Sequence, residues 1–509
     1  MGVVACGPSD DRECNGASDL SEDPNNCGTC GNVCTTGFSC VDYRCIEGAC
    51  QPGKVEDCYT AYPETEGVGP CKGGKRTCIA GGIWGACEGE VTPVGENCAD
   101  GVDNNCSGAV DEDVDLDMDG YTTCAGDCCD STECTKPGLA NPGAFDAAGN
   151  MFDDDCNGVA DDTILLCDQS LSSNTTVAMD FAKAIDICQT ATATDKKWGV
   201  IDAKLSLADG TGVPDKEGYS IRPRFGTGVL PQGGVNLAII SSGGAAAKGD
   251  TMPNYHDFSG YSHVAPNTSP FPQDFYMANG NKIPNAPGCP NPNGAVANDP
   301  VMLTFRVRVP TNARSFKLFS NFYSAEFPEW TCSPYNDFFV VLLDSTYMGD
   351  PANPMDKNLA FYTPPGSMTK VPVGVNLGHG NTGLFTQCVN GVTGCSGTAG
   401  SISTCVGTTM LAGTGFDDPQ SGSCDAGSLK GGGTGWLETR GNVTPGEVIT
   451  LRIAVWDMSD HILDSLSVVD GFQWSTEVAQ PGTDIFISKD PTPGPQQRFS
   501  LSSITSELQ

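Results

Sequence analysis

The distribution of cysteine is the feature that most constrains how this chain can fold. Of the 27 cysteines, 21 lie between Cys6 and Cys188, and six follow between Cys289 and Cys424. The first third is rich in glycine and asparagine and poor in large apolar side chains, so burial alone does not offset its conformational entropy. A disulfide over a loop of about 15 residues contributes roughly 3 kcal/mol. We therefore expect disulfide-stapled modules first and a different kind of domain after them.

Some of these cysteines would also suit one of two other roles. Cys27 and Cys30, followed by Cys34 and Cys40, have a spacing that also suits a zinc site or a redox centre. No nearby histidine, separated four-ligand set or βαβ pattern accompanies them. Structural disulfides are therefore predicted at Cys27, Cys30, Cys34, Cys40, Cys98, Cys106, Cys124, Cys128, Cys129, Cys134, Cys167 and Cys188.

Disulfides form in oxidising compartments, so we expect a secreted or cell-surface protein. The sequence shows no apolar h-region and no run of about 20 apolar residues. Residues 3–7, Val-Val-Ala-Cys-Gly, resemble the end of a bacterial lipoprotein signal. Setting Cys6 aside also leaves an even number of cysteines. We predict lipidation at Cys6 within an N-terminal segment 1–23, with a spare thiol as the alternative.

The charge balance narrows the classes of partner. The chain has 63 acidic and 27 basic residues, for a net charge of −36. Such a chain repels nucleic acid and anionic lipid headgroups and attracts cations. We expect no nucleic-acid partner, and membrane contact only through an N-terminal lipid.

The acidic residues concentrate in 96–162, which holds 18 Asp and Glu but only one basic residue, Lys136. Asp115, Asp117 and Asp119 alternate, and Gly120 follows where a coordinating loop turns sharply. These are positions 1, 3, 5 and 6 of a calcium loop. Hard oxygen ligands favour calcium over magnesium, copper or zinc. A solvated acidic linker is the alternative.

The loop does not continue as an EF-hand. Tyr121 occupies the position at which an EF-hand binds calcium through a backbone carbonyl. Gly126, however, stands where an EF-hand has glutamate, and Asp127 comes one place later. Cysteines and glycines flank the loop instead of helices, so the closer analogy is a disulfide-stapled thrombospondin type-3 repeat. The predicted metal ligands are Asp103, Asn104, Asp111, Asp115, Asp117, Asp119, Tyr121, Asp127, Asp130, Asp153, Asp155 and Asp161.

The cysteine-rich part resembles modules of myxobacterial-type surface proteins. Residues 24–50 are similar to stigma-specific-like cysteine repeats, and 51–95 look like a second cysteine module. Residues 96–163 resemble the MopE-type metal-binding motif, through Cys98-Ala-Asp-Gly-Val-Asp-Asn-Asn-Cys106 and Asp153-Asp-Asp-Cys-Asn-Gly-Val-Ala-Asp161. The chain departs from this motif where Cys129 replaces an expected Asp and where a cysteine is missing around Asn150. A disulfide between Cys129 and Cys134 would account for the cysteine at position 129 and would leave Asp130 as a ligand.

From about residue 164 the composition changes to longer apolar patterns. Residues 174–189 have helical spacing, and Cys188 can pair with Cys167 across this segment. Strand-like alternation or β-branched and aromatic enrichment follows at 301–309, 315–323, 337–344, 448–456 and 466–474. Long loops are expected at 241–298 and 345–445. We predict a mainly β protein, with calcium-loop modules followed by a jelly-roll-like antiparallel β-sandwich over 164–478.

Two motifs in this domain resemble the choice-of-anchor L family of bacterial cell-surface proteins. One is Asn321-Phe-Tyr-Ser-Ala-Glu-Phe-Pro-Glu-Trp330, followed by Tyr335-Asn-Asp337; the other is Ile453-Ala-Val-Trp-Asp-Met-Ser-Asp-His-Ile-Leu-Asp464. The resemblance implies surface presentation rather than a reaction. Acidic and amide side chains at the expected strand ends are candidates for a second calcium site: Glu326, Asn336, Asp337, Asp457, Asp460 and Asp464. Hydrogen bonding to loop amides is the alternative.

The four histidines are scattered, and no zinc-protease or nucleophile-elbow motif occurs. The tail, 479–509, is polar and rich in proline. We therefore expect a non-catalytic calcium-binding protein of adhesion or of the cell envelope, with a glycan or protein surface as partner. The alternatives are a metal-scavenging surface protein and a secreted carboxylate-based hydrolase.

Overall fold

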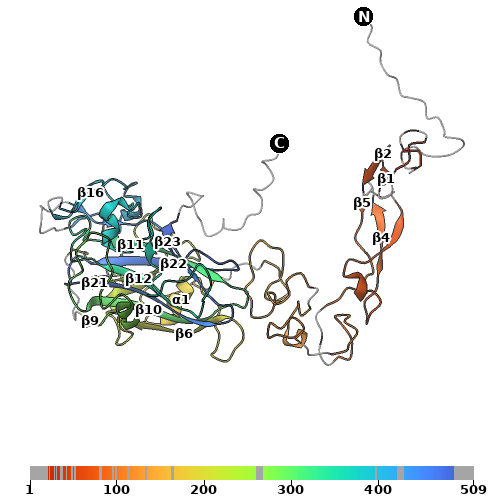
Figure 1. The fold of residues 1–509 in the computed structure, drawn as a ribbon, viewed down its shortest axis with the longest axis horizontal. Coiled ribbons are helices and arrows are strands. Elements are labelled where there is room, and N and C mark those ends of the chain that lie inside the picture. Colours follow the sequence, from red (N-terminus) through yellow and green to blue (C-terminus); the bar gives the residue numbers. More distant parts are fainter. Residues whose placement is uncertain are drawn as a thin grey trace, which may run out of the picture. The chain divides into compact units, whose positions relative to one another are not determined.

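A computed structural model describes residues 21–486 of the chain, except for residues 22, 24, 28, 30, 35–37, 42, 48–49, 51–52, 80–82, 95–96, 98–99, 112–114, 132–133, 162–165, 260–266, 396–397 and 421–428. The predicted lipidation site Cys6, the predicted disulfide cysteines Cys30 and Cys98, and most of the tail lie outside the described residues. The chain divides into two compact units, 1–141 and 142–509. Figure 1 colours the first unit red to orange and the second from yellow to blue.

Unit 1 (1–141) contains little regular structure. Its elements are a hairpin, a three-stranded antiparallel sheet and two 3-10 helices: β1 (Phe38–Val41), β2 (Arg44–Glu47), β3 (Val55–Cys58), η1 (Pro63–Thr65), β4 (Gly74–Ile79), β5 (Ile83–Trp84) and η2 (Thr123–Ala125). The buried apolar side chains described in this unit are mostly cysteines: Cys27, Cys40, Cys50, Cys71, Cys78, Cys106, Tyr121, Cys129 and Ala140. Disulfides therefore occupy the place of an apolar core, as the composition predicts.

Two of the disulfide pairs described in unit 1, Cys50–Cys78 and Cys71–Cys106, cross the module boundaries that the sequence suggested. Six pairs join described residues: Cys27–Cys40, Cys34–Cys45, Cys50–Cys78, Cys58–Cys87, Cys71–Cys106 and Cys129–Cys134. Cys124 and Cys128 are also disulfide-bonded. The predicted Cys129–Cys134 pair is confirmed, and Cys71–Cys106 ties the second cysteine module to the acidic segment. This density of disulfides is typical of secreted and extracellular proteins.

Unit 2 is an antiparallel β-sandwich (Figure 1). The smaller sheet has the order β12-β21-β10-β6, with β9 added beside β10: β6 (Gly199–Ser206), β9 (Thr268–Ser269), β10 (Ala297–Arg308), β12 (Phe338–Asp344) and β21 (Val448–Met458). The larger has the order β23-β20-β11-β22-β8-β7, with β19 added beside β11: β7 (Tyr219–Arg222), β8 (Leu237–Ser241), β11 (Ser315–Ser324), β19 (Gly432–Gly433), β20 (Leu437–Asn442), β22 (Ser465–Ser475) and β23 (Gly482–Ile485). The predicted mainly β fold class is confirmed.

Shorter elements lie outside the two sheets. They are α1 (Ala178–Ala184), η3 (Lys216–Gly218), α2 (Gln273–Ala278), β13 (Phe361–Tyr362), β14 (Val371–Pro372), η4 (Val375–Asn381), β15 (Gly391–Thr393), β16 (Gly400–Ile402), η6 (Thr409–Leu411), β17 (Pro419–Gln420) and β18 (Leu429–Lys430). None of the helices among the described residues is long and apolar enough to cross a membrane.

The main core lies between the two sheets. Alternate residues of β10, such as Leu303 and Phe305, share it with Phe316 and Leu318 of β11. The outer face of the smaller sheet is covered by α2 through Phe275. Burial on both faces explains why the predicted strands are apolar in long runs rather than in strict alternation.

All five predicted strands are present with ends shifted by only a few residues. The predicted helix 174–189 is shorter, covering Ala178–Ala184, and the predicted Cys167–Cys188 disulfide is present. The expected long loop 345–445 is wrong in part, because it contains β20, which pairs with β11 and β23. Its sequence, Leu-Glu-Thr-Arg-Gly-Asn, carries a weak strand signal because neighbouring strands, rather than apolar side chains, stabilise it.

The boundary between the units falls inside the acidic segment 96–163. Residues from Pro142 onward belong to the sandwich unit. The Asn312 side chain donates to the Phe145 carbonyl (2.9 Å) and accepts the Phe145 N–H (3.0 Å), and Phe145 packs against the main core. The second half of the acidic segment is therefore anchored to the sandwich.

Replacing Asn312 by alanine should release this anchor. Asn312→Ala leaves the Phe145 N–H and carbonyl without their partners, which costs about 1–3 kcal/mol locally. We expect faster proteolytic cleavage within 142–161, read by mass spectrometry of the fragments, with little change in the cleavage of unit 1. Asn390→Ala, on an exposed loop of the same unit, is the control, and equal cleavage rates in both variants would contradict the assignment.

Candidate metal centres

The predicted calcium loop of unit 1 folds around its own aspartates. The N–H groups of Asp119 and Gly120 donate to Asp115 (3.2 and 2.9 Å), and the Tyr121 N–H donates to Asp119 (2.8 Å). Met118 and Gly120 have left-handed backbone angles, φ 64° and 97°. This turn directs the carboxylates of positions 1, 3 and 5 toward one another.

Two further aspartates close the group. Asp115, Asp117 and Asp130 each place an oxygen within 4.8 Å of the others, and Asp117, Asp119 and Asp127 do the same. Asp130 accepts the N–H groups of Leu116 (2.6 Å) and Thr123 (2.8 Å), so the chain after the loop folds back across it. The five aspartates that the sequence placed in this stretch are thus brought together.

Burying these carboxyl groups destabilises the fold unless a cation neutralises their charge. Asp127 is 2% exposed, and its Oδ2 has no hydrogen-bond partner among the described residues. Burial, followed by the charges of Asp119 and Asp117, raises the pKa of Asp127 to about 7, although the Cys129 N–H opposes this shift. Burial likewise raises the pKa of Asp119. A divalent cation would remove both penalties.

The flanking predicted ligands form a structural repeat, 100–111 and 150–161. In each copy the aspartate at the fourth position, Asp103 or Asp153, accepts the N–H groups four and five residues further along the chain. The last, Asp111 or Asp161, accepts N–H groups at the start of its copy. These backbone bonds satisfy much of the acceptor capacity of the four carboxylates.

The sequence-predicted ligands in these two loops are less concentrated than those of 115–130. Asp155 accepts the Asn157 N–H (3.2 Å), and the Asn104 side chain accepts the Asn97 N–H (2.9 Å). Within the described residues, no group of three close carboxylates includes Asp103, Asp111, Asp153, Asp155 or Asp161. Their role as ligands stays a prediction.

The second predicted site lies at one end of the sandwich. Glu326 follows β11 and Asp464 precedes β22 in the larger sheet, where Ser324 pairs with Ser465. Asp337 precedes β12 and Asp457 lies near the end of β21 in the smaller sheet, where Phe338 pairs with Trp456. Oxygens of Glu326, Asp337 and Asp457 lie within 4.8 Å of one another. Paired strands from both sheets therefore deliver these side chains to one place.

This cluster is almost completely buried. Glu326, Asp337, Asp457 and Asp464 are at most 2% exposed. Each has at least one oxygen that lacks a hydrogen-bond partner in the described part of the chain, and for Asp457 this holds for both oxygens. Among the described residues, no lysine or arginine lies within ion-pair distance of these four side chains. Several carboxylates are buried here with no visible compensating charge.

The electrostatic consequences are large. Burial, reinforced by the neighbouring carboxylates, raises the pKa of Glu326, Asp457 and Asp464 well above its ordinary value. Burial raises the pKa of Asp337 to about 7, although the Met458 N–H donates to it (3.2 Å). Asp460 is less buried, and its pKa is also raised by burial.

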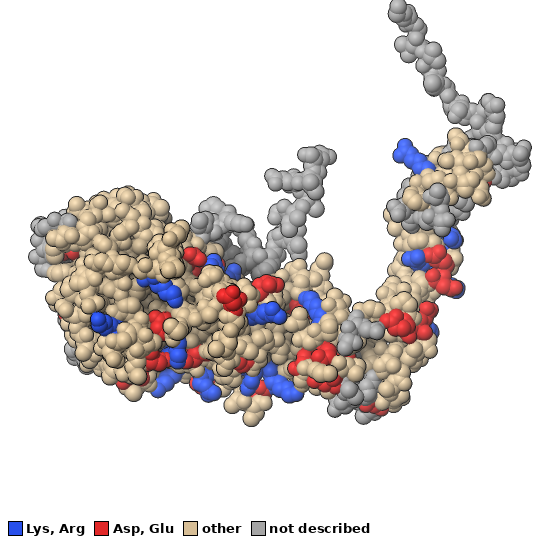
Figure 2. Space-filling model, viewed as in Figure 1, with Lys and Arg blue, Asp and Glu red and all other residues tan. Residues whose placement is uncertain are grey.

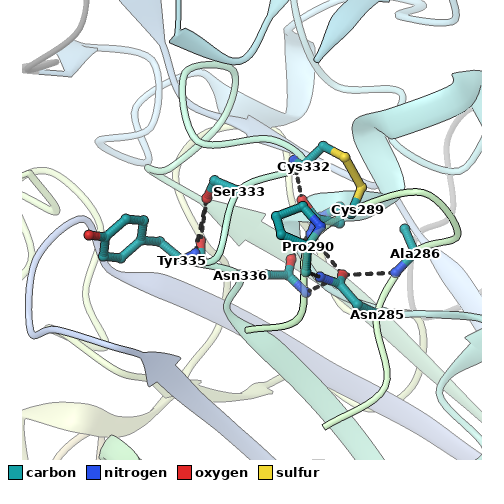
Figure 3. Close-up of a disulfide and its surroundings, with 9 residues drawn as sticks. Asn285, Ala286, Cys289, Pro290, Cys332, Ser333, Tyr335 and Asn336 are labelled. Carbon is teal, nitrogen blue, oxygen red and sulfur yellow. Dashed lines mark hydrogen bonds between the residues drawn. A yellow bond between two sulfur atoms is a disulfide. The ribbon is translucent and has the colours of Figure 1, made fainter. Parts of the chain in front are cut away.

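Asn336 takes part through its side chain in a hydrogen-bond network with neighbouring loops. Its side chain accepts the Asn376 N–H (2.9 Å) and donates to Asn285 (3.2 Å), beside the Cys289–Cys332 disulfide. Figure 3 shows Asn336 turned toward Asn285 in this network. These hydrogen bonds fix the loop that precedes β12, and the role of Asn336 as a ligand stays a prediction.

The sequence also missed a neighbouring pair. His461 Nδ1 lies 2.5 Å from an oxygen of Asp299, a buried residue beside a bulge in β10. Its contact with His461 joins residues 162 positions apart, which no local pattern could reveal. On the face drawn in Figure 2, acidic and basic side chains are interspersed over the sandwich, so surface charge does not mark the buried cluster.

Both groups fit a hard divalent cation. They offer carboxylate oxygens with unmet bonding capacity, which calcium accepts as ligands. Neither group contains the cysteine or histidine that zinc and copper prefer. In comparisons with known protein families, with curated proteins and with solved structures, no match to this chain was found.

The stability of calcium-free protein should depend on pH in an unusual direction. The folded-state pKa of Asp337, about 7, lies above its unfolded value of about 3.9. Unfolding therefore releases a proton between these values, and the free energy of unfolding should fall as pH rises from about 4 to about 7. Urea unfolding in calcium-free buffer, followed by near-ultraviolet circular dichroism, measures this dependence.

The variant Asp337→Asn is the control for this experiment, because it removes the titrating group while keeping its size. Its stability should fall less over the same pH range. A wild-type stability that stays constant or rises between about pH 5 and pH 7 would show that Asp337 is ionised in the calcium-free fold.

Proposed function

We propose that this protein is a non-catalytic, calcium-binding, extracellular protein that acts in adhesion or in the structure of a cell envelope or matrix. The observation that carries the proposal is the buried group of Glu326, Asp337 and Asp457. Its oxygens converge, and within the described ranges they include unpartnered atoms and have no basic side chain beside them. An isolated buried carboxylate is costly, so such a group is retained where a cation compensates it.

Calcium is the cation that best suits this group. It takes six to eight oxygen ligands in flexible geometry, whereas magnesium requires near-ideal octahedral geometry and keeps more water. The calcium concentration outside cells suits sites of moderate affinity in extracellular modules. Asp117, Asp119 and Asp127 support a further site of the same kind in unit 1.

Location at a cell surface rests on different grounds. The disulfides support an extracellular environment. Cell attachment rests on the resemblances to choice-of-anchor L domains and MopE-type modules, and on lipidation at Cys6. In this proposal, calcium stiffens the acidic segment and the sandwich presents a binding surface to a glycan or protein partner.

The variant Asp457→Asn separates a calcium site from a purely structural carboxylate cluster. Asp457 is buried at the cost of a raised pKa, so removing its carboxyl group should raise the stability of calcium-free protein at neutral pH by at least about 1 kcal/mol. The same change should abolish most of the calcium-induced stabilisation, which is about 2.7 kcal/mol at a calcium concentration 100 times Kd. Thermal unfolding with and without calcium measures both effects.

Asp350→Asn, at an exposed position of the same unit, is the matched control and should change neither value. If Asp457→Asn instead lowered the calcium-free stability and left the calcium effect intact, the cluster would be a hydrogen-bonded structural feature. The calcium-site proposal would then be wrong for unit 2.

Calcium should also protect the acidic segment from proteolysis. Chelation leaves Asp115, Asp117 and Asp119 to repel one another, so we expect faster cleavage within 100–161 under non-reducing conditions. Asp117→Asn should be cleaved quickly even with calcium, because Asp117 belongs to both carboxylate groups. Unchanged resistance after chelation would contradict a calcium-stabilised segment.

A further inference from the structure

A pocket of about 280 Å³ opens in unit 2 beside the buried carboxylates. Its lining includes Glu326, Trp330, Tyr335, Asp460 and Ile462. Glu326 belongs both to this lining and to the group that it forms with Asp337 and Asp457. Glu326 therefore lies between the pocket and the other two carboxylates of the proposed cation site.

Two aromatic side chains form one wall of the pocket. The rings of Trp330 and Tyr335 meet edge to face, with centroids 5.2 Å apart. The backbone N–H of Trp330 donates to the Glu326 carbonyl (2.8 Å), so a single turn of the chain separates the tryptophan from the carboxylate. Ile462, with 56% of its surface exposed, adds an aliphatic contact.

The chain between the two rings is fixed covalently. Cys332 forms a disulfide with Cys289, and its N–H donates to the Asn376 side chain (2.5 Å). The Tyr335 N–H donates to Ser333 (3.0 Å). Figure 3 shows the Tyr335 ring projecting away from the disulfide. The wall is therefore preorganised, which lowers the entropic cost of binding.

We propose that this pocket binds a carbohydrate ring, with the hydroxyl groups of the sugar facing the calcium site at Glu326 and its apolar face against Trp330 and Tyr335. This inference rests on the proposed function. Three carboxylates leave calcium with capacity for further oxygen ligands, which sugar hydroxyls supply. Pockets that join apolar walls to a few polar groups are typical of small-ligand sites.

An organic cation is the competing occupant, because aromatic rings and carboxylates also attract ammonium groups. With calcium bound at Glu326, however, a second positive charge in the same pocket would be repelled. The two ligands therefore respond oppositely to calcium. A neutral sugar requires calcium, whereas an ammonium compound binds better after chelation.

The test uses the full-length, disulfide-bonded chain on a printed array of neutral oligosaccharides, in calcium and after chelation. We expect binding to a subset of the glycans in calcium and its loss after chelation. Trp330→Ala and Tyr335→Ala should each weaken the affinity by about tenfold or more, measured by calorimetry with the strongest bound glycan. Trp84→Ala, which changes a partly exposed tryptophan of unit 1, is the control.

Calcium calorimetry on the same variants separates this inference from the proposed function. Trp330→Ala should bind calcium like the wild type, since the ring is not a ligand. If the wild type binds calcium but no glycan, the carbohydrate inference is overturned while the proposed function survives. Tighter binding of tetramethylammonium after chelation would overturn it in favour of the organic cation. Absence of calcium binding would overturn both.

Discussion

A cluster of carboxyl groups buried inside the sandwich, with no basic partner among the described residues, is the constraint on which the rest of the structure depends. Glu326, Asp337, Asp457 and Asp464 lie where strands of both sheets end. Their burial is imposed by strand pairing, because the neighbouring Phe338 and Trp456 belong to the apolar layer under α2. The sheets cannot form without bringing these carboxylates together, so binding of the proposed cation would be linked to folding.

The two units are stabilised by different kinds of interaction. Unit 1 buries cysteines and pairs them, and its acidic loop depends on backbone N–H groups and proposed cations for order. Unit 2 has a continuous apolar core between its sheets. The loop 100–111 belongs to unit 1 and its repeat, 150–161, belongs to unit 2. The same loop conformation therefore occurs in a disulfide-stabilised unit and in a unit with an apolar core.

Local patterns predicted the features that local chemistry determines. The spacing of Asp115, Asp117 and Asp119 indicated a turn that the structure contains, and apolar runs marked the central strands. Features that depend on distant partners were not predictable. The pairing of β20, the contact of Asp299 with His461 and the docking of Phe145 on Asn312 all join residues whose neighbours in sequence carry no signal. The amide of Asn336 suits either a metal ligand or a loop hydrogen bond, and its neighbours in sequence do not distinguish these two roles.

The sandwich also has two unlike ends. At the end opposite the carboxylates, Phe316 of β11 stacks on Phe472 of β22 (5.0 Å between centroids), and Trp474 packs edge-on against both rings. That end is held by apolar packing, which is indifferent to ions and to moderate changes of acidity. The stability of the acidic end depends on the ions and the pH of the surrounding solution. Local opening of the native state should therefore begin at the acidic end and leave the aromatic end closed.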